Sequence, residues 1–138
     1  MTEAEGTPFE VAISATEADL DELGHVNNVV YLRWVQEAAA AHWRTLTTLA
    51  QREAVAWVVV RHEIDYKRPA LAGDALVART WVGPATKGTF ERHTEILRPR
   101  DGQVLARART LWCPVNPSTG RPTLVGRDVR RLASTLDG

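Results

Sequence analysis

The chain has 138 residues, of which 44% are hydrophobic and 25% charged, values that are ordinary for one globular domain and argue against disorder. Seventeen basic residues balance seventeen acidic ones, so no bulk field favours nucleic acid or an anionic membrane surface. The longest apolar run, residues 54–60, is far shorter than the roughly 20 residues that span a bilayer. Cys113 is the one cysteine and the acidic first residues do not resemble a signal peptide, so we expect a single cytoplasmic domain, residues 1–138.

Periodicity predicts a first strand and then one long helix. Residues 9–16 alternate roughly between apolar and polar, the pattern of a half-buried strand. From residue 28 to about residue 49 the apolar positions recur at helical spacing, and no Gly or Pro interrupts them. Four consecutive alanines, residues 38–41, give this helix small side chains on every face, so that a sheet can approach it closely. We therefore expect a central, largely buried helix.

Four β-rich segments follow the helix, and residues 126–136 could form a short closing helix. The connections between the segments are short and rich in turn residues, as antiparallel hairpins require, so we predict a four-stranded antiparallel meander. In residues 106–109 two alanines share one face, which suits a strand lying against a helix. The predicted fold class is α+β, a curved five-stranded antiparallel sheet with the helix on one face, whose strand ends invite pairing with a second copy. The four segments are residues 55–68, 76–82, 89–97 and 104–115.

The segment from Asp19 to Asn28 is the one stretch with the composition of a site. It places two carboxylates, an imidazole and two amides in ten residues, immediately before the long helix. Short polar side chains there can cap the helix, and the unpaired N–H groups of a helix start attract negative charge. Acid–base groups beside an anion-stabilising helix start are the parts of an acyl-transfer site.

Residues 21–31, Asp-Glu-Leu-Gly-His-Val-Asn-Asn-Val-Val-Tyr, resemble the loop and helix start of hotdog-fold acyl-CoA thioesterases of the 4-hydroxybenzoyl-CoA thioesterase type. Plant acyl-ACP thioesterases carry a similar His-Val-Asn-Asn element. The resemblance implies a hotdog fold, in which the sheet wraps around the long helix, and a homodimer or homotetramer with active sites at the dimer interface. It continues in order through Trp34, Glu37, residues 64–70, Gly73-Asp74, Gly88-Thr89 and residues 120–122.

The resemblance assigns roles to several residues of the loop. It makes Asp21 the catalytic carboxylate, which acts as nucleophile or general base on the thioester carbonyl. Asn28 stands where the family's helix begins, so its backbone N–H is the candidate oxyanion donor, a group worth roughly 3 to 4 kcal/mol of barrier. His25 and Asn27 are expected to position the substrate. Leu23 occupies the position of a functional Asn in the plant enzymes, and because leucine cannot hydrogen-bond through its side chain, their mechanism does not transfer intact.

Each of these loop residues also has a purely structural explanation. Asp21 could cap a turn or helix, and Asp19 is better explained as a residue that orders the loop. A histidine before a helix is often only hydrogen-bonded to backbone, which is the alternative for His25. Asn27 and Asn28 can cap the helix without any further role.

Further substrate contacts are predicted at Tyr31, Lys87 and Thr89. Tyr31 also has the helical spacing that is typical of a core residue. Lys87, in a predicted hairpin, is the preferred partner for the phosphates of coenzyme A. Glu37 on the long helix is a rival catalytic carboxylate, unless it pairs with an arginine. Other cations that could meet phosphate, or lie on a solvated strand face, are Arg68, Arg92 and Arg98.

We therefore predict an acyl-CoA thioesterase, which converts an acyl-CoA, or an acyl-carrier-protein thioester, and water into a carboxylic acid and a free thiol. No cofactor is expected beyond the coenzyme A of the substrate, and no metal, since the histidines lack a spacing such as H-E-x-x-H. One alternative is a hotdog hydratase or dehydratase. The hydratases that it would resemble use an Asp and a His in the pattern D-x-N-P-x-H, whereas here Asp21 and His25 are four residues apart with neither the Asn nor the Pro. The other is a non-catalytic acyl-CoA binding module, which predicts ligand-induced stabilisation without turnover.

Overall fold

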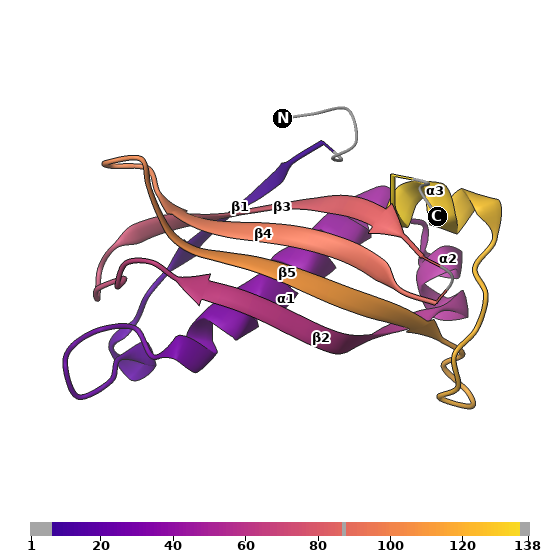
Figure 1. Cartoon of the computed structure of the whole chain (residues 1–138), viewed down its shortest axis with the longest axis horizontal. Coiled ribbons are helices and arrows are strands. Elements are labelled where there is room, and N and C mark those ends of the chain that lie inside the picture. Colours follow the sequence, from indigo (N-terminus) through magenta and orange to yellow (C-terminus); the bar gives the residue numbers. More distant parts are fainter. Residues whose placement is uncertain (1–6, 87, 136–138) are drawn as a thin grey trace.

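The computed structural model describes residues 7–86 and 88–135. In this part of the chain five antiparallel strands form one sheet in the order β1-β3-β4-β5-β2, and a long helix crosses one face of it (Figure 1). This is the hotdog fold that the sequence predicts. The elements are β1 (Phe9–Ser14), the 3-10 turn η1 (Glu17–Asp19), α1 (Asn28–Leu46), α2 (Leu49–Ala54), β2 (Ala56–Tyr66), β3 (Ala75–Ala85), β4 (Phe90–Arg98), β5 (Gln103–Val115) and α3 (Arg127–Ala133).

The predicted four-stranded meander is wrong, because β2 is not a neighbour of β3. Only β3, β4 and β5 follow one another across the sheet, while β2 pairs with β5 and β1 pairs with β3. Turn residues between β2 and β3 show where the chain reverses, but they do not select the partner strand. β1 and β4 occupy the two sides of β3, so β2 cannot pair with it. β2 instead lies beside β5, at the edge of the sheet opposite β1.

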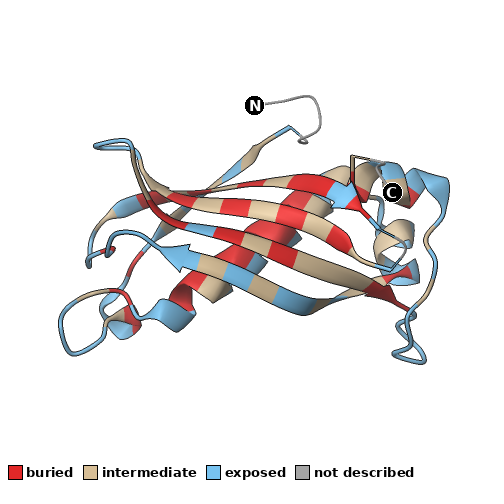
Figure 2. Ribbon diagram, in the orientation of Figure 1, coloured by how far each residue is buried: buried red, intermediate tan, exposed pale blue. Residues whose placement is uncertain are grey.

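The long helix is central and buried along one side, as predicted. α1 lies nearest to β3, β1 and β4, and Figure 2 shows buried positions concentrated on α1 and the inner strands. Ala38 of α1 and Ala106 of β5 belong to the same core cluster, so small residues on both elements allow the close approach expected from the sequence. The buried residues of α1 are Val30, Tyr31, Trp34, Val35, Ala38, Ala39 and His42.

The helical segments end earlier than predicted. α1 stops at Leu46 because a second helix begins after Thr48. The Thr48 hydroxyl accepts a hydrogen bond from the Gln51 N–H (3.2 Å), and the Gln51 side chain accepts one from the Thr48 N–H (2.9 Å), a capping box that starts α2. The closing helix is α3, and residue 136 of its predicted range lies outside the described residues. In the described part of the chain, no helix is long and apolar enough to cross a membrane.

The β3–β4 connection is shorter than predicted, since Gly83 and Pro84 belong to β3. The pairing of β3 with β4 is irregular between Val82 and Ala85. An irregular position tolerates proline, which has no N–H to donate to a ladder. This extension carries the β3–β4 hairpin to the end of the sheet that lies beside α3 (Figure 1).

Candidate active site

The loop before α1 is held in place by backbone hydrogen bonds. The Asp21 N–H donates to the His25 carbonyl (2.7 Å), and the Gly24 N–H donates to the Asp21 carbonyl (3.1 Å). Gly24 has a φ of 76°, a conformation that favours glycine. The Val26 N–H donates to the carbonyl of Ala70, which lies between β2 and β3, at 2.8 Å. These contacts set the position of the Asp21 side chain.

The carboxylate of Asp21 has one oxygen engaged by the loop and one oxygen open. Oδ1 accepts hydrogen bonds from the N–H groups of Leu23 (2.9 Å) and His25 (3.0 Å), so the turn-capping explanation is confirmed. Within residues 7–86 and 88–135 no group hydrogen-bonds to Oδ2, and Asp21 is exposed. The cap therefore orients the carboxylate and leaves Oδ2 accessible for chemistry.

The start of α1 offers a free backbone donor beside this loop. Asn27 caps the helix, since its Oδ1 accepts from the Val29 N–H at 3.2 Å. The N–H of Asn28 makes no hydrogen bond with any described residue, and Asn28 is an exposed residue. The helix macrodipole adds partial positive charge at this position. The Asn28 carbonyl accepts from the Tyr66 hydroxyl (3.1 Å), which ties the helix start to the end of β2. The catalytic roles of Asn28, Asn27 and His25 stay predictions.

Asp19 is buried and orders the loop, which confirms the structural explanation for this residue. Its carboxylate accepts from the backbone N–H and the hydroxyl of Thr16 (3.0 and 3.1 Å) and from Arg33 (3.1 Å). The Thr16 N–H in particular, together with the Arg33 guanidinium, holds the pKa of Asp19 below its usual value in spite of burial. Arg33 also pairs with Glu37 (3.4 Å), as the structural alternative for Glu37 predicts.

Tyr31 belongs to the core, and a direct substrate contact through it is not supported. The residue is 2% exposed, and its hydroxyl accepts a hydrogen bond from the Ala70 N–H at 2.9 Å. Burial raises the pKa of this phenol, so the hydroxyl stays protonated. Because Ala70 also accepts from the loop residue Val26, Tyr31 supports the loop from beneath.

The other predicted contacts lie in the β3–β4 hairpin. Lys87 is outside the described residues. The Thr89 carbonyl accepts from the Thr86 N–H (2.8 Å) and the two threonine hydroxyls are 2.6 Å apart, so Thr89 closes the hairpin. A substrate contact through Thr89 stays a prediction.

One chain does not bring the hairpin to the Asp21 loop. Phe90, the residue after Thr89, packs against Trp57, which packs in turn against Trp43 near the end of α1 (ring centroids 5.0 and 5.5 Å apart). Trp43 follows Asn28 on the same helix at a rise of about 1.5 Å per residue, so the two parts of the predicted site are roughly 22 Å apart along α1.

Two of the arginines proposed as phosphate partners have other roles. Arg98 pairs with Asp101 (2.8 Å), which closes the β4–β5 turn, and with Asp74 (3.3 Å), the residue before β3. Arg92 is 7% exposed and lies inside the molecule, so neither of the predicted alternatives, phosphate binding at the surface or a solvated strand face, is right for it. The alternation of β4 contains the signal for this, since Arg92 shares the inward face with Phe90 and Ile96.

Three comparisons with known proteins agree with this architecture. Residues 16–132 match the family model described as the Thioesterase-like superfamily. The chloroplastic palmitoyl-acyl carrier protein thioesterase of Gossypium hirsutum is 24% identical over 128 residues, which are 86% of this chain and 30% of that protein. This chain thus spans about a third or less of the length of the curated relatives that it matches.

Solved structures share the fold over most of the chain. A 1,4-dihydroxy-2-naphthoyl-CoA thioesterase from Synechocystis is 22% identical with a TM-score of 0.79, over 92% of this chain and 96% of that one. A thioesterase from Thermus thermophilus, complexed with coenzyme A and Zn, is 24% identical with a TM-score of 0.78, over 90% of each chain. At these identities the likeness establishes the fold.

Proposed function

This chain belongs to the thioesterase-like superfamily, and on that premise we propose that it hydrolyses the thioester of an acyl-CoA to a carboxylic acid and free coenzyme A. One observation carries the proposal. The carboxylate of Asp21 is oriented through Oδ1 by two backbone N–H groups and exposes Oδ2, and the unpaired Asn28 N–H follows at the start of α1. A base or nucleophile beside an anion-binding helix start is what hydrolysis of a thioester requires.

In the proposed reaction, Oδ2 of Asp21 either removes a proton from the attacking water or attacks the carbonyl carbon itself. The new C–O bond converts the carbonyl oxygen into an oxyanion, which accepts a hydrogen bond from the Asn28 N–H. The C–S bond then breaks, and the coenzyme A thiolate leaves and takes up a proton. If Asp21 attacks directly, water hydrolyses the resulting anhydride in a second step. His25 and Asn27 flank this path and position the substrate.

The variant Asp21→Asn tests the role of the carboxylate. An asparagine Oδ1 can still accept both loop N–H bonds, so the loop should keep its shape while the side chain loses its basicity. We expect kcat/KM to fall about 10²- to 10⁴-fold, measured as thiol release from short, long, branched and aryl acyl-CoAs. Glu22→Gln, which neutralises the neighbouring exposed carboxylate of the same loop, is the matched control and should retain activity. Equal rates for Asp21→Asn and the wild type would exclude Asp21 from the chemistry.

The same preparations separate the proposal from its two alternatives. A hydratase would remove the conjugated absorbance of an enoyl-CoA without releasing thiol. A binding module would show stabilisation by an acyl-CoA, seen as a raised Tm, with no turnover of any thioester. Either result would replace the thioesterase proposal.

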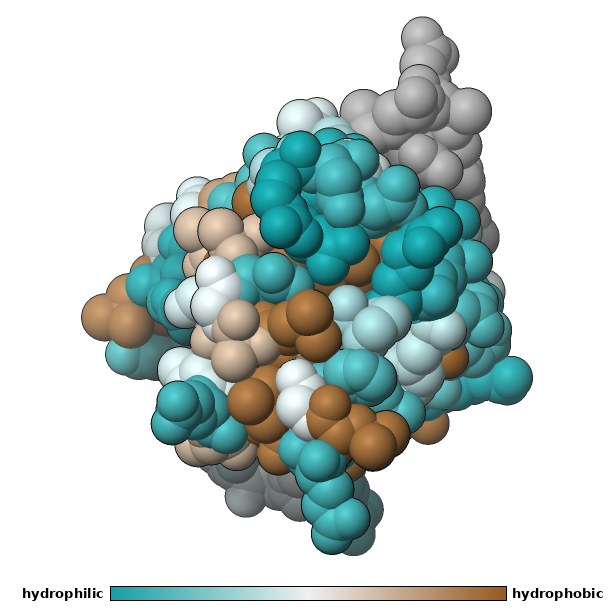
Figure 3. All heavy atoms as spheres, turned by 90° about the vertical axis from the view of Figure 1, so that its left-hand side faces the viewer, coloured by the Kyte–Doolittle hydropathy of each residue, from teal (hydrophilic) through white to brown (hydrophobic). Residues whose placement is uncertain are grey.

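We also propose that the active form is a homodimer. β2 is an edge strand with no buried residue, and its Val58 and Val60 are 44% and 56% exposed. Apolar side chains are exposed at the Asp21 end too, where Leu23 and Val29 are 77% and 66% exposed, and Figure 3 shows apolar atoms between polar ones on this end. An exposed apolar edge invites pairing with a second copy. A second copy could also bring its β3–β4 hairpin to the Asp21 loop, which one chain cannot do.

Mixing two inactive variants tests this arrangement. Asp21→Asn and Lys87→Glu would place one defect in each half of a shared site. In a random mixture half of the dimers are mixed, and each mixed dimer has one intact site of two, so about a quarter of the wild-type activity should return. No recovery, or a monomer in sedimentation equilibrium, would contradict the dimer. If Lys87→Glu is fully active alone, the hairpin has no part in the site.

The single cysteine of the sequence supports a proposal about the location of the protein. Cys113 is free and half-buried, which suits a reducing compartment, and we propose that the protein resides in the cytoplasm. Detection of the protein in a membrane or secreted fraction of its own cells would contradict this.

A further inference from the structure

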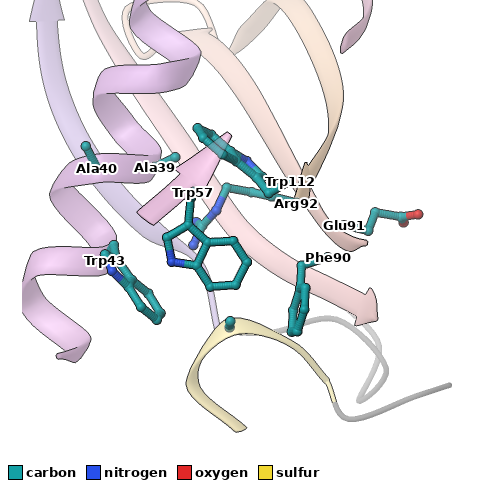
Figure 4. A pocket seen from close by; sticks show the side chains of 9 residues that line it. Ala39, Ala40, Trp43, Trp57, Phe90, Glu91, Arg92 and Trp112 are labelled. Atoms are coloured by element: carbon teal, nitrogen blue, oxygen red, sulfur yellow. The ribbon is translucent and has the colours of Figure 1, made fainter. Parts of the chain in front are cut away.

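A cavity of about 210 Å³ lies between the C-terminal half of α1 and the sheet, at the end of α1 away from the Asp21 loop (Figure 4). Its walls are mainly aromatic, with Trp43 from α1, Trp57 from β2, Phe90 from β4 and Trp112 from β5. Ala133 of α3 also lines it. Such walls favour a flat or branched apolar ligand.

Two charged residues, Glu91 and Arg92, line this cavity, and the carboxylate of Glu91 is directed away from the aromatic side chains, so Arg92 is the charged group among them (Figure 4). Arg92 extends from β4 past the indole of Trp57 toward α1. Its Nη1 donates to Nδ1 of His42 (2.9 Å) and to the hydroxyl of Thr80 (3.1 Å). Burial and the charge of Arg92 lower the pKa of His42 to about 4, so both acceptors are neutral at pH 7. Burial lowers the pKa of Arg92 to about 10, which leaves the guanidinium charged.

The charge of Arg92 has no counter-ion among residues 7–86 and 88–135. Its neighbour Glu91 instead pairs with Arg109 (2.7 Å) and His93 (2.7 Å). A guanidinium has five N–H donors, and the three on Nε and Nη2 of Arg92 find no acceptor in the described chain. An anion in the cavity would supply the counter-charge and the hydrogen-bond acceptors that these donors lack in the described chain.

We propose that this cavity binds a small apolar carboxylate, whose ring or branched chain packs against the aromatic walls and whose carboxylate accepts hydrogen bonds from Arg92. The size of the cavity limits the ligand. An engineered apolar cavity of about 150 Å³ takes up benzene, so this cavity accommodates a single ring with a carboxylate but no long fatty chain. This cavity lies at the opposite end of α1 from the Asp21 loop, so ligand binding there does not depend on thioesterase activity.

Benzoate and its neutral isostere benzamide test the proposal on the full chain. Binding is measured by calorimetry and by the fluorescence of the cavity tryptophans. A hydrogen bond to a charged group contributes enough to favour benzoate by about 10- to 100-fold. Arg92→Met should weaken benzoate binding by a similar factor and leave benzamide binding within about threefold. Arg107→Met, which removes an exposed arginine of β5, is the matched control and should bind benzoate as the wild type does.

A second variant keeps the proposal testable if Arg92→Met does not fold. Ala133→Leu fills the cavity from α3 without touching Arg92, and it should abolish binding of both probes while the circular dichroism spectrum stays unchanged. Asp21→Asn should bind benzoate as the wild type does, so the benzoate-binding proposal and the catalytic proposal can be refuted independently of each other. Equal affinity of the wild type for the two probes, unchanged benzoate binding by Ala133→Leu, or no benzoate binding at millimolar concentration would overturn the proposal.

Discussion

Tyr31→Phe removes one buried hydroxyl and leaves the aromatic ring in place. In the wild type the Ala70 N–H donates to this hydroxyl at 2.9 Å. Tyr31 is 2% exposed and Ala70 is fully buried, so water cannot replace the lost acceptor. An unsatisfied buried donor costs about 1 to 3 kcal/mol. For a domain of this size that corresponds to a fall in Tm of about 4 to 12 °C.

The assay is urea unfolding of wild type and variant at one protein concentration, because the stability of an oligomer depends on concentration. Tyr66→Phe is the matched control. It removes a hydroxyl that donates to the Asn28 carbonyl, but Tyr66 is 41% exposed and water can take its place, so we expect a cost below about 0.5 kcal/mol. Equal stability of Tyr31→Phe and the wild type would refute the argument. A lower kcat/KM with unchanged stability would instead restore the predicted substrate contact of Tyr31.

Three further substitutions test other parts of the structure. The pKa of His42 is about 4 in the folded chain and about 6.5 in the unfolded chain. As the pH falls below 6.5, the unfolded state therefore binds a proton at His42 before the folded state does, and the free energy of unfolding declines toward pH 4 by up to about 3 kcal/mol. His42→Gln keeps an acceptor for Arg92 and should flatten that decline in urea unfolding, and an unaltered slope would count against the assignment. Thr48→Ala should lower the free energy of unfolding by about 1 kcal/mol through loss of the α2 cap, whereas Thr48→Ser should not, and equal Tm values would exclude the cap. Gly24→Ala should cost about 1 to 2 kcal/mol because its φ is 76°, while Gly88→Ala meets open space and should be neutral in the same thermal scan.

The loop and the helix start could be predicted because their determinants are close in sequence. Asp21 reaches N–H groups two and four residues ahead, and Asn27 caps the helix that begins at the next residue. Likewise, the alternation of Ala106 and Ala108 predicts which face of β5 meets the core, and both are buried. Short-range contacts of this kind are set by backbone geometry, so a pattern of neighbouring residues specifies them.

Only the tertiary structure decided which distant residues meet. The pairing of β2 with β5 depends on which sheet edge remains free once β1 and β4 flank β3, and no turn signal contains that information. The sequence pattern predicts Arg92 at the surface, yet it lies beside His42, fifty residues away, in an aromatic cavity. The sequence by itself determined the fold class, the long helix and the Asp21 loop. The strand order, the buried arginine and the distance between loop and hairpin follow from packing, because long-range contacts depend on the whole set of surfaces that must be buried together.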